Sequence, residues 1–163
     1  MNTDAELLAR QMGHAARGHW RAVSRCKYGV PTVIATAPFA DGAPFPTLYW
    51  LTCPVLVREV GAVESAGGVA AWQRRLAADA VLADRMRAAD REYRALRDAE
   101  GDGVDMCAGV GVAGQRDVLA TKCLHAHVAA RLAGLDDPVG EGVLAVIETE
   151  CDDARCMRDG EDR

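Results

Sequence analysis

The sequence predicts a helix-rich α+β fold, in which a small three-stranded antiparallel meander packs against several α-helices. Short runs rich in β-branched and aromatic residues occur at residues 19–25, 32–37 and 47–52. The connectors between these runs are short and contain the glycine and proline that are typical of turns. After Pro54 the apolar residues follow helical spacing, and a hydrophobic content of 50% with only 5% aromatic residues points to helix-favouring alanine.

The expected helices follow from capping signals and apolar spacing. The first spans residues 3–12, because Thr3 and Glu6 stand in the capping-box relation and Gly13 follows as a stop. Pro54 suits the first turn of the second helix. Further helices are predicted over residues 54–65, from residue 69 after the break Gly67-Gly68, from the cap Asp79, over residues 117–132 and over residues 140–148.

The apolar spacing after Asp79 predicts which face of the following helix is buried. Met86 and Tyr93 fall on the apolar spacing of three and four residues, so both are expected in the core. The arginines between them alternate with acidic residues, which predicts a solvated helix face. These arginines are Arg85, Arg87, Arg91, Arg94 and Arg97.

Length and charge limit the classes of protein to consider. The 163 residues suit one domain, expected over residues 1–148, followed by an acidic, cysteine-bearing tail at 149–163 whose composition suits disorder. A net charge of −5 argues against nucleic acid or an anionic membrane as a partner. The N-terminus has no pattern of a secretory signal, and no apolar run is long enough to span a bilayer. A cytoplasmic protein is therefore expected.

Cysteine and histidine residues form the most informative pattern. In a reducing compartment, six cysteines are better candidates for metal ligands, reactive thiols or buried apolar groups than for disulfides. The first and third strands of a meander run the same way, so Cys26 and Cys53 emerge at one end of the sheet. Cys123 and His127 are four residues apart on a helix, and docking this helix there would complete a Cys3His zinc site. If the helix begins later, His125 could replace His127.

Other interpretations of these residues stay open. The chain has no CxxC pair, and the ligands would come from three separate segments. The cysteines could equally be ordinary buried thiols, and the histidines surface or capping groups. Cys107 falls in a loop and is expected to be incidental. Cys151 and Cys156 could form a second metal site, join the first one, or simply be exposed.

The segment Gly109-Val-Gly-Val-Ala-Gly114 matches the GxGxxG pattern of dinucleotide sites and precedes a predicted helix. A true fingerprint follows a buried strand directly, and the residues before this segment do not predict one. A weaker anion site at the helix start, formed by Gly111, Gly114, Arg116 and Lys122, is the alternative. Otherwise the glycines only permit a tight connection.

Several blocks of the chain resemble a known family. They are RC at residues 25–26, PFPTLYWLTCP at 44–54, KCLHAH at 122–127 and DPVG at 137–140. The sequence is similar, over about residues 10 to 147, to the mainly actinobacterial domain of unknown function five hundred and one. The resemblance implies importance for Cys26, Cys53, Cys123 and His125, in small cytosolic proteins without an established activity. The resemblance also implies that histidine can stand at the Cys53 position in relatives, an exchange that suits a zinc ligand.

Three functions are open for these cysteine and histidine residues. Four protein ligands would make a structural zinc site in a binding or regulatory module, with residues 44–50 as the surface that contacts an unknown protein or small molecule. Three ligands and a water would suit a metal-dependent hydrolase. A Cys–His thiol enzyme is the third function, with Cys123 at a helix start beside His127. The first is preferred, because thiolate-rich sites are commonly closed and no HExxH motif is present.

Overall fold

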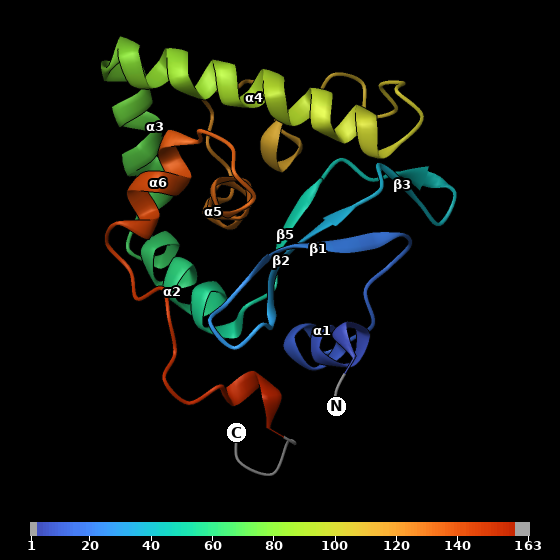
Figure 1. Ribbon diagram of the computed structural model, residues 1–163. Helices are drawn as coiled ribbons and strands as arrows, with labels where there is room; N and C mark the ends of the chain where they lie inside the picture. Colours follow the sequence, from blue (N-terminus) through green and yellow to red (C-terminus); the bar gives the residue numbers. More distant parts are fainter. Residues whose placement is uncertain (1–2, 159–163) are drawn as a thin grey trace.

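A computed structural model describes residues 3–158 and has the predicted α+β class (Figure 1). A small sheet lies between a group of helices on one side and the N-terminal helix on the other. The helices are α1 (Asp4–Met12), α2 (Pro54–Ser65), α3 (Gly68–Ala78), α4 (Ala80–Glu100), α5 (Leu124–Leu132) and α6 (Pro138–Leu144). Two short 3-10 turns, η1 (Val112–Gly114) and η2 (Arg155–Met157), complete them. No helix in this described range is both long and apolar enough to cross a membrane.

The main sheet is the expected antiparallel meander. Its strands are β1 (Trp20–Arg25), β2 (Pro31–Thr36) and β5 (Tyr49–Leu51), and β2 lies in the centre. The connection from β2 to β5 contains a small hairpin of β3 (Phe39–Ala40) and β4 (Ala43–Pro44). All six residues of β2 are buried, because this strand lies between β1 and β5 and α1 packs against it.

Side chains alternate between the two faces of the sheet, which creates two different environments. Val33, Ala35 and Tyr49 belong to the main hydrophobic core beneath the helices. Ile34 pairs with Trp50 across the strands, and both line a cavity on the opposite face, beside the end of α1. The aromatic segment before α2 therefore borders the core with one set of residues and a surface cavity with the other.

Several helix boundaries are confirmed because they depend on local chemistry. Thr3 and Glu6 form the reciprocal capping box of α1, and Gly13 ends this helix with a left-handed φ of 78°. Pro54 occupies the first turn of α2. The Asp79 carboxylate accepts hydrogen bonds from the amides of Val81 and Leu82 and so begins α4.

The helix predicted at residues 117–132 begins seven residues later than expected. Asp117 closes only an isolated turn, in which its carboxylate accepts the Leu119 amide at 3.0 Å. The chain then stays non-helical, and the Gln73 side chain donates to the Thr121 carbonyl at 2.8 Å. The helix starts at Leu124 instead, with Cys123 as its N-cap residue. The last helix also differs from its predicted range of 140–148, because Asp137 caps it and Pro138 opens it.

The buried face of α4 agrees with the predicted spacing, except at one arginine. Met86 and Tyr93 have no exposed surface. The prediction of a solvated face was wrong for Arg97, whose side chain is 1% exposed. Its Nη1 donates to the Pro46 carbonyl at 3.1 Å, so this arginine supports the aromatic segment before β5. Arg94, by contrast, pairs with Asp90 while keeping about a third of its side chain exposed.

The chain after α6 returns to the sheet, and this segment, residues 149–158, is called the tail below (Figure 1). Arg10 Nη1 of α1 donates to the Met157 carbonyl at 3.3 Å. Lys27, at the β1–β2 turn, forms ion pairs with Glu150 and Asp152. Residues 159–163 of the predicted disordered segment lie outside the described residues, so their disorder stays a prediction.

Replacement of Tyr93 by phenylalanine tests the link between α4 and the sheet. The Tyr93 hydroxyl accepts a hydrogen bond from the buried Leu48 amide at 2.7 Å, and burial raises its pKa to about 12. Without this hydroxyl the amide has no acceptor, so Tyr93→Phe should lower the free energy of unfolding by about 1–3 kcal/mol in urea denaturation. The matched control Tyr28→Phe changes an exposed tyrosine and should shift it by less than about 0.5 kcal/mol. Equal effects of the two changes would contradict this role of Tyr93.

Candidate metal centre

Three side chains of residue types that can bind a metal ion lie close together where α2 ends and α5 begins. One ligand atom from each of Glu64, Cys123 and His125 lies within 4.8 Å of the other two. Within residues 3–158, this is the one group of three or more histidine, cysteine or acidic residues that is so closely spaced. Glu64 comes from the last turn of α2, Cys123 caps α5, and His125 lies in the first turn of α5.

Glu64 holds the other two residues in place. Its Oε1 accepts the Leu124 amide at 2.7 Å and lies 3.2 Å from His125 Nδ1. The first amides of a helix have no partner within the helix, so this carboxylate satisfies one of them from another element. Cys123 and His125 flank Leu124 in the sequence, and the same contact therefore positions both side chains.

His125 is oriented on its far side as well. Its Nε2 lies 3.0 Å from the Val57 carbonyl, an acceptor, so Nε2 carries a proton. Nδ1 then faces Glu64 and Cys123. Metal-binding histidines commonly donate the remote N–H to a carbonyl in this way, which leaves the other nitrogen for the ion.

The same surroundings favour the protonated imidazole when no ion is bound. Hydrogen bonding to Cys123 is the largest effect, and with the Val57 carbonyl and the Glu64 charge it raises the pKa of His125 to about 9, against the opposing effect of burial. In the metal-free protein, the protonated imidazole of His125 thus attracts both Glu64 and Cys123. Because a metal ion needs the neutral imidazole, it must displace this proton.

A cavity of about 340 Å³ opens beside Cys123 and His125. Leu51, Val57, Ala113 and Ala126 form apolar parts of its wall, and Thr47, Tyr49 and Trp50 of the aromatic segment complete it. Among the residues that the structure describes, no carboxylate lines this cavity, so an ion held by the three residues would face a mainly apolar space.

The predicted Cys3His set is divided between different parts of the structure. Cys26 and Cys53 do emerge at one end of the sheet, where both line a cavity of about 240 Å³. Cys123 lines the other cavity, together with His125. The alternative in which the helix begins later and His125 replaces His127 as the neighbour of Cys123 matches the observed geometry. Whether any of these residues binds a metal stays a prediction.

His127 occupies the interface between α5 and α6. Its side chain is fully buried, and its Nδ1 lies 2.7 Å from Asp137 Oδ2. Asp137 also caps α6 through the amides of Val139 and Gly140. A β-carbon at Gly140 would lie 2.2 Å from the His127 carbonyl oxygen, so the two helices pack backbone against backbone. These contacts give His127 a structural role in joining α5 to α6.

The glycine-rich segment expected as a weak anion site is occupied by the protein itself. The Val112 amide donates to the buried Asp90 carboxylate at 3.1 Å, and a β-carbon at Gly111 would lie 1.8 Å from it. The amides of Gly111 and Gly114 donate to the carbonyls of Gln115 and Gly111. The two basic residues, Arg116 and Lys122, are exposed. Gly111 thus permits a close approach to α4, and the segment does not begin a helix.

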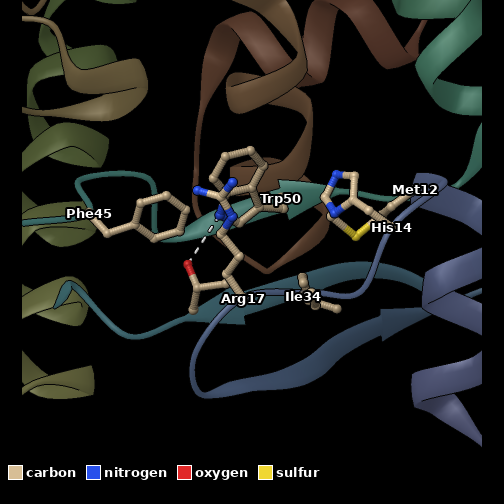
Figure 2. Close-up of a pocket in the computed structure, with 8 residues that line it drawn as sticks. Met12, His14, Arg17, Ile34, Phe45 and Trp50 are labelled. Carbon is tan, nitrogen blue, oxygen red and sulfur yellow. Dashed lines mark hydrogen bonds between the residues drawn. The ribbon is translucent and has the colours of Figure 1, made fainter. Parts of the chain in front are cut away.

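The aromatic segment borders a second cavity, of about 240 Å³, on the α1 face of the sheet. Figure 2 shows Phe45 and Trp50 at this cavity, with Arg17, Ile34, His14 and Met12 around it. The rings of Phe45 and Trp50 stack with centroids 5.3 Å apart, and Trp50 Nε1 donates to Thr36 Oγ1 at 3.1 Å. Trp50, on the edge strand β5, lines both this cavity and the one beside Cys123.

Comparison with known proteins agrees with the sequence blocks that the fold brings to these sites. Residues 22–145 match the sequence profile of the family described as Protein of unknown function (DUF501). The chain belongs to the DUF501 family. No curated protein and no solved structure matches it significantly. The matched range of this DUF501 chain includes Glu64, Cys123 and His125, and it ends before Cys151.

Sequence reasoning missed Glu64 in this DUF501 chain. An acidic residue in the last turn of a helix opposes the helix dipole, which favours cations there. The last turn of α2 contains Glu64 and no basic residue. That unfavourable position was a weak signal of another role, but its partners lie some sixty positions away in the sequence and no local pattern identifies them.

The elevated pKa of His125 predicts how stability depends on pH. Because the folded pKa is about 9 and the unfolded value about 6.5, protonated His125 stabilises the fold fully below pH 6.5 and loses this effect as the pH rises through 9. Metal-free protein should therefore lose free energy of unfolding over this interval, and His125→Gln should remove that loss.

Exposed His19 provides the control, because His19→Gln should leave the pH dependence as it is in the original protein. An NMR titration measures the same quantity directly. A midpoint for His125 near its ordinary value of about 6.5 would contradict the proposed contacts.

Proposed function

We propose that this protein binds a zinc ion through Glu64, Cys123 and His125 and uses it to hold a small ligand in the adjoining cavity. The observation that carries the proposal is the spacing of the three ligand atoms, all within 4.8 Å, beside that cavity. The expected structural site had four protein ligands, whereas three are near one another here. The fourth coordination position is therefore assigned to water or to the bound ligand.

The donor set favours zinc over other common ions. A thiolate, an imidazole and a carboxylate are all ligands of Zn²⁺, which prefers four positions in a tetrahedron. Calcium and magnesium prefer oxygen ligands throughout, so a cysteine and a histidine argue against both. Val57 contributes by fixing the far nitrogen of the imidazole through its carbonyl.

The cavity wall supports a binding module more than a hydrolase. A metal-dependent hydrolase needs a group that takes a proton from the attacking water. Apart from Cys123 and His125, Tyr49 is the one titratable residue in the described part of the chain that lines the cavity, and burial is the main cause that raises its pKa. Thr47 and Trp50 place the aromatic segment at the cavity, so the predicted contact surface of residues 44–50 would hold the apolar part of the ligand.

Removal of each proposed ligand should weaken zinc binding. Replacing even a supporting residue of a metal site commonly costs about 10–100-fold in affinity, so Cys123→Ala and His125→Ala should each cost at least that much in competition titrations with a chelating dye. His19→Ala is the control for an exposed histidine and should have no effect. An unchanged number of bound zinc ions, at unchanged affinity, in Cys123→Ala and the original protein would exclude this site.

Cobalt substitution tests for the open position. The visible spectrum of Co²⁺ depends on its ligands, so azide should change the spectrum if the fourth position accepts an external ligand. The His127→Ala change at the α5–α6 interface keeps all three proposed ligands, and any folded protein with this change should respond to azide in the same way. A spectrum insensitive to azide would favour a site closed by protein groups.

A Cys–His thiol function is a second candidate, and one observation favours it. Both nitrogens of His125 face acceptors, so the imidazole is a cation beside the Cys123 sulfur at the start of a helix. Nucleophilic cysteines are activated by such neighbours. The metal-free protein should then react with iodoacetamide at Cys123 faster than at buried Cys107, and His125→Gln should slow the reaction. Peptide mapping by mass spectrometry measures both rates, and equal labelling of the two cysteines would contradict this candidate.

A further inference from the structure

Four of the six cysteines gather at a place separate from the Glu64 site. Cys26, Cys53, Cys151 and Cys156 all line one cavity of about 240 Å³ between the β1–β2 turn, the start of α2 and the tail. Each of the four is partly buried and free of any disulfide. Burial raises the pKa of both Cys53 and Cys156, and each is raised further by the charges of the other cysteines at this cavity.

All four cysteines stand where the chain turns or where a helix starts. Cys26 follows β1, and its carbonyl accepts the Gly29 amide in the turn before β2. Cys53 is the N-cap residue of α2. Between Cys151 and Cys156, the left-handed φ of 46° at Ala154 turns the chain so that both cysteines border the same cavity. Three segments that are distant in sequence therefore supply sulfur atoms to one place.

We infer that Cys26, Cys53, Cys151 and Cys156 form a second, structural zinc site that fastens the tail to the β1–β2 turn. Four thiolates around one ion are a common structural zinc site, and the Cys-x4-Cys spacing of the tail lies within its usual range. This site has four protein ligands, so no position is left for a substrate. It shares no residue with Glu64, Cys123 and His125, and it does not depend on the function proposed for them.

The sulfur atoms must draw together when the ion binds. A tetrahedral ion with Zn–S bonds of about 2.3 Å holds its sulfurs about 3.8 Å apart. In the described part of the chain no three of these four sulfurs lie within 4.8 Å of one another. Binding of the ion would therefore require rotation of the cysteine side chains between their staggered positions and an inward movement of the tail.

The ion pairs that hold the tail to the β1–β2 turn are weak, and a metal ion would strengthen this attachment. Lys27 pairs with Glu150 and Asp152, whose side chains are 63% and fully exposed, and such ion pairs contribute little to stability. Ordering a chain segment without regular structure carries a large cost in conformational entropy. A four-thiolate site offsets that cost, and Lys27 lies close enough to balance part of its negative charge.

Metal binding by a Cys123→Ala variant tests this site alone, because that change removes the Glu64 site. Reduced, metal-free protein is titrated with Co²⁺, and a strong near-ultraviolet charge-transfer band from thiolate ligands should reach its limit at one equivalent. Adding Cys151→Ala and Cys156→Ala should abolish tight binding. Adding Cys107→Ala instead is the matched control, since Cys107 lines neither metal cavity, and should leave the band unchanged.

Two results would overturn the inference. One is a Cys123→Ala protein that binds neither Co²⁺ nor Zn²⁺ tightly, or that binds them equally well without Cys151 and Cys156. The other is mass spectrometry of protein purified without a reducing agent that finds the four cysteines joined in disulfides. An original protein that binds only one equivalent of Co²⁺, with the same thiolate band as Cys123→Ala, would instead overturn only the function proposed above.

Limited proteolysis measures the attachment of the tail independently. Arg155 is exposed and lies between the two tail cysteines. Trypsin needs the chain around it to open locally before it can cut. Zinc at ten times its dissociation constant or more should slow this cut by at least about tenfold, because it lowers the open population by that factor. Exposed Arg17, in the connection before β1, is the internal control and should be cut at an unchanged rate. Cleavage after Arg155 that is insensitive to zinc would contradict the inference.

Discussion

The hydrogen bond from the Leu124 amide to Glu64 is the interaction on which the candidate metal centre depends. It supplies a partner for a free amide at the start of α5 and so fixes where this helix begins. Cys123 becomes the N-cap residue, and His125 falls in the first turn beside it. A helix that began at residue 117 would place Cys123 well inside it and match Cys123 with His127. One carboxylate from α2 thus selects which histidine accompanies the cysteine.

Local chemistry explains which parts of the fold were predictable. The capping box at Thr3, the cap at Asp79 and Pro54 in the first turn of α2 act within a few residues, and each appears where expected. The meander was also predictable, and it explains why Cys26 and Cys53 share a cavity. The start of α5 and the burial of Arg97 were not predictable from the sequence. The first amide of α5 bonds to Glu64, and Arg97 bonds to the Pro46 carbonyl, and both partners are distant in sequence.

The cysteines of this chain lie at different sites, depending on the element that contains them. The β1–β2 turn, the start of α2 and the tail bring four of them to one cavity, whereas Cys123 stands alone with Glu64 and His125 at another. Cys107 is buried near the Pro38 carbonyl and borders neither cavity. Four thiolates favour a closed structural ion, and three mixed ligands beside an apolar cavity favour an open one. We therefore propose different tasks for the two places: attachment of the tail and binding of a ligand.

Anomalous diffraction from crystals of the zinc-loaded protein tests the central claim most directly. Data collected on both sides of the zinc absorption edge locate the ion without reference to any assumed ligand. The account predicts a peak at bonding distance from Cys123 Sγ, His125 Nδ1 and a Glu64 carboxylate oxygen, with a fourth ligand that is not a protein group. A map without zinc at Cys123, or with zinc held there by His127 in place of His125, would contradict it.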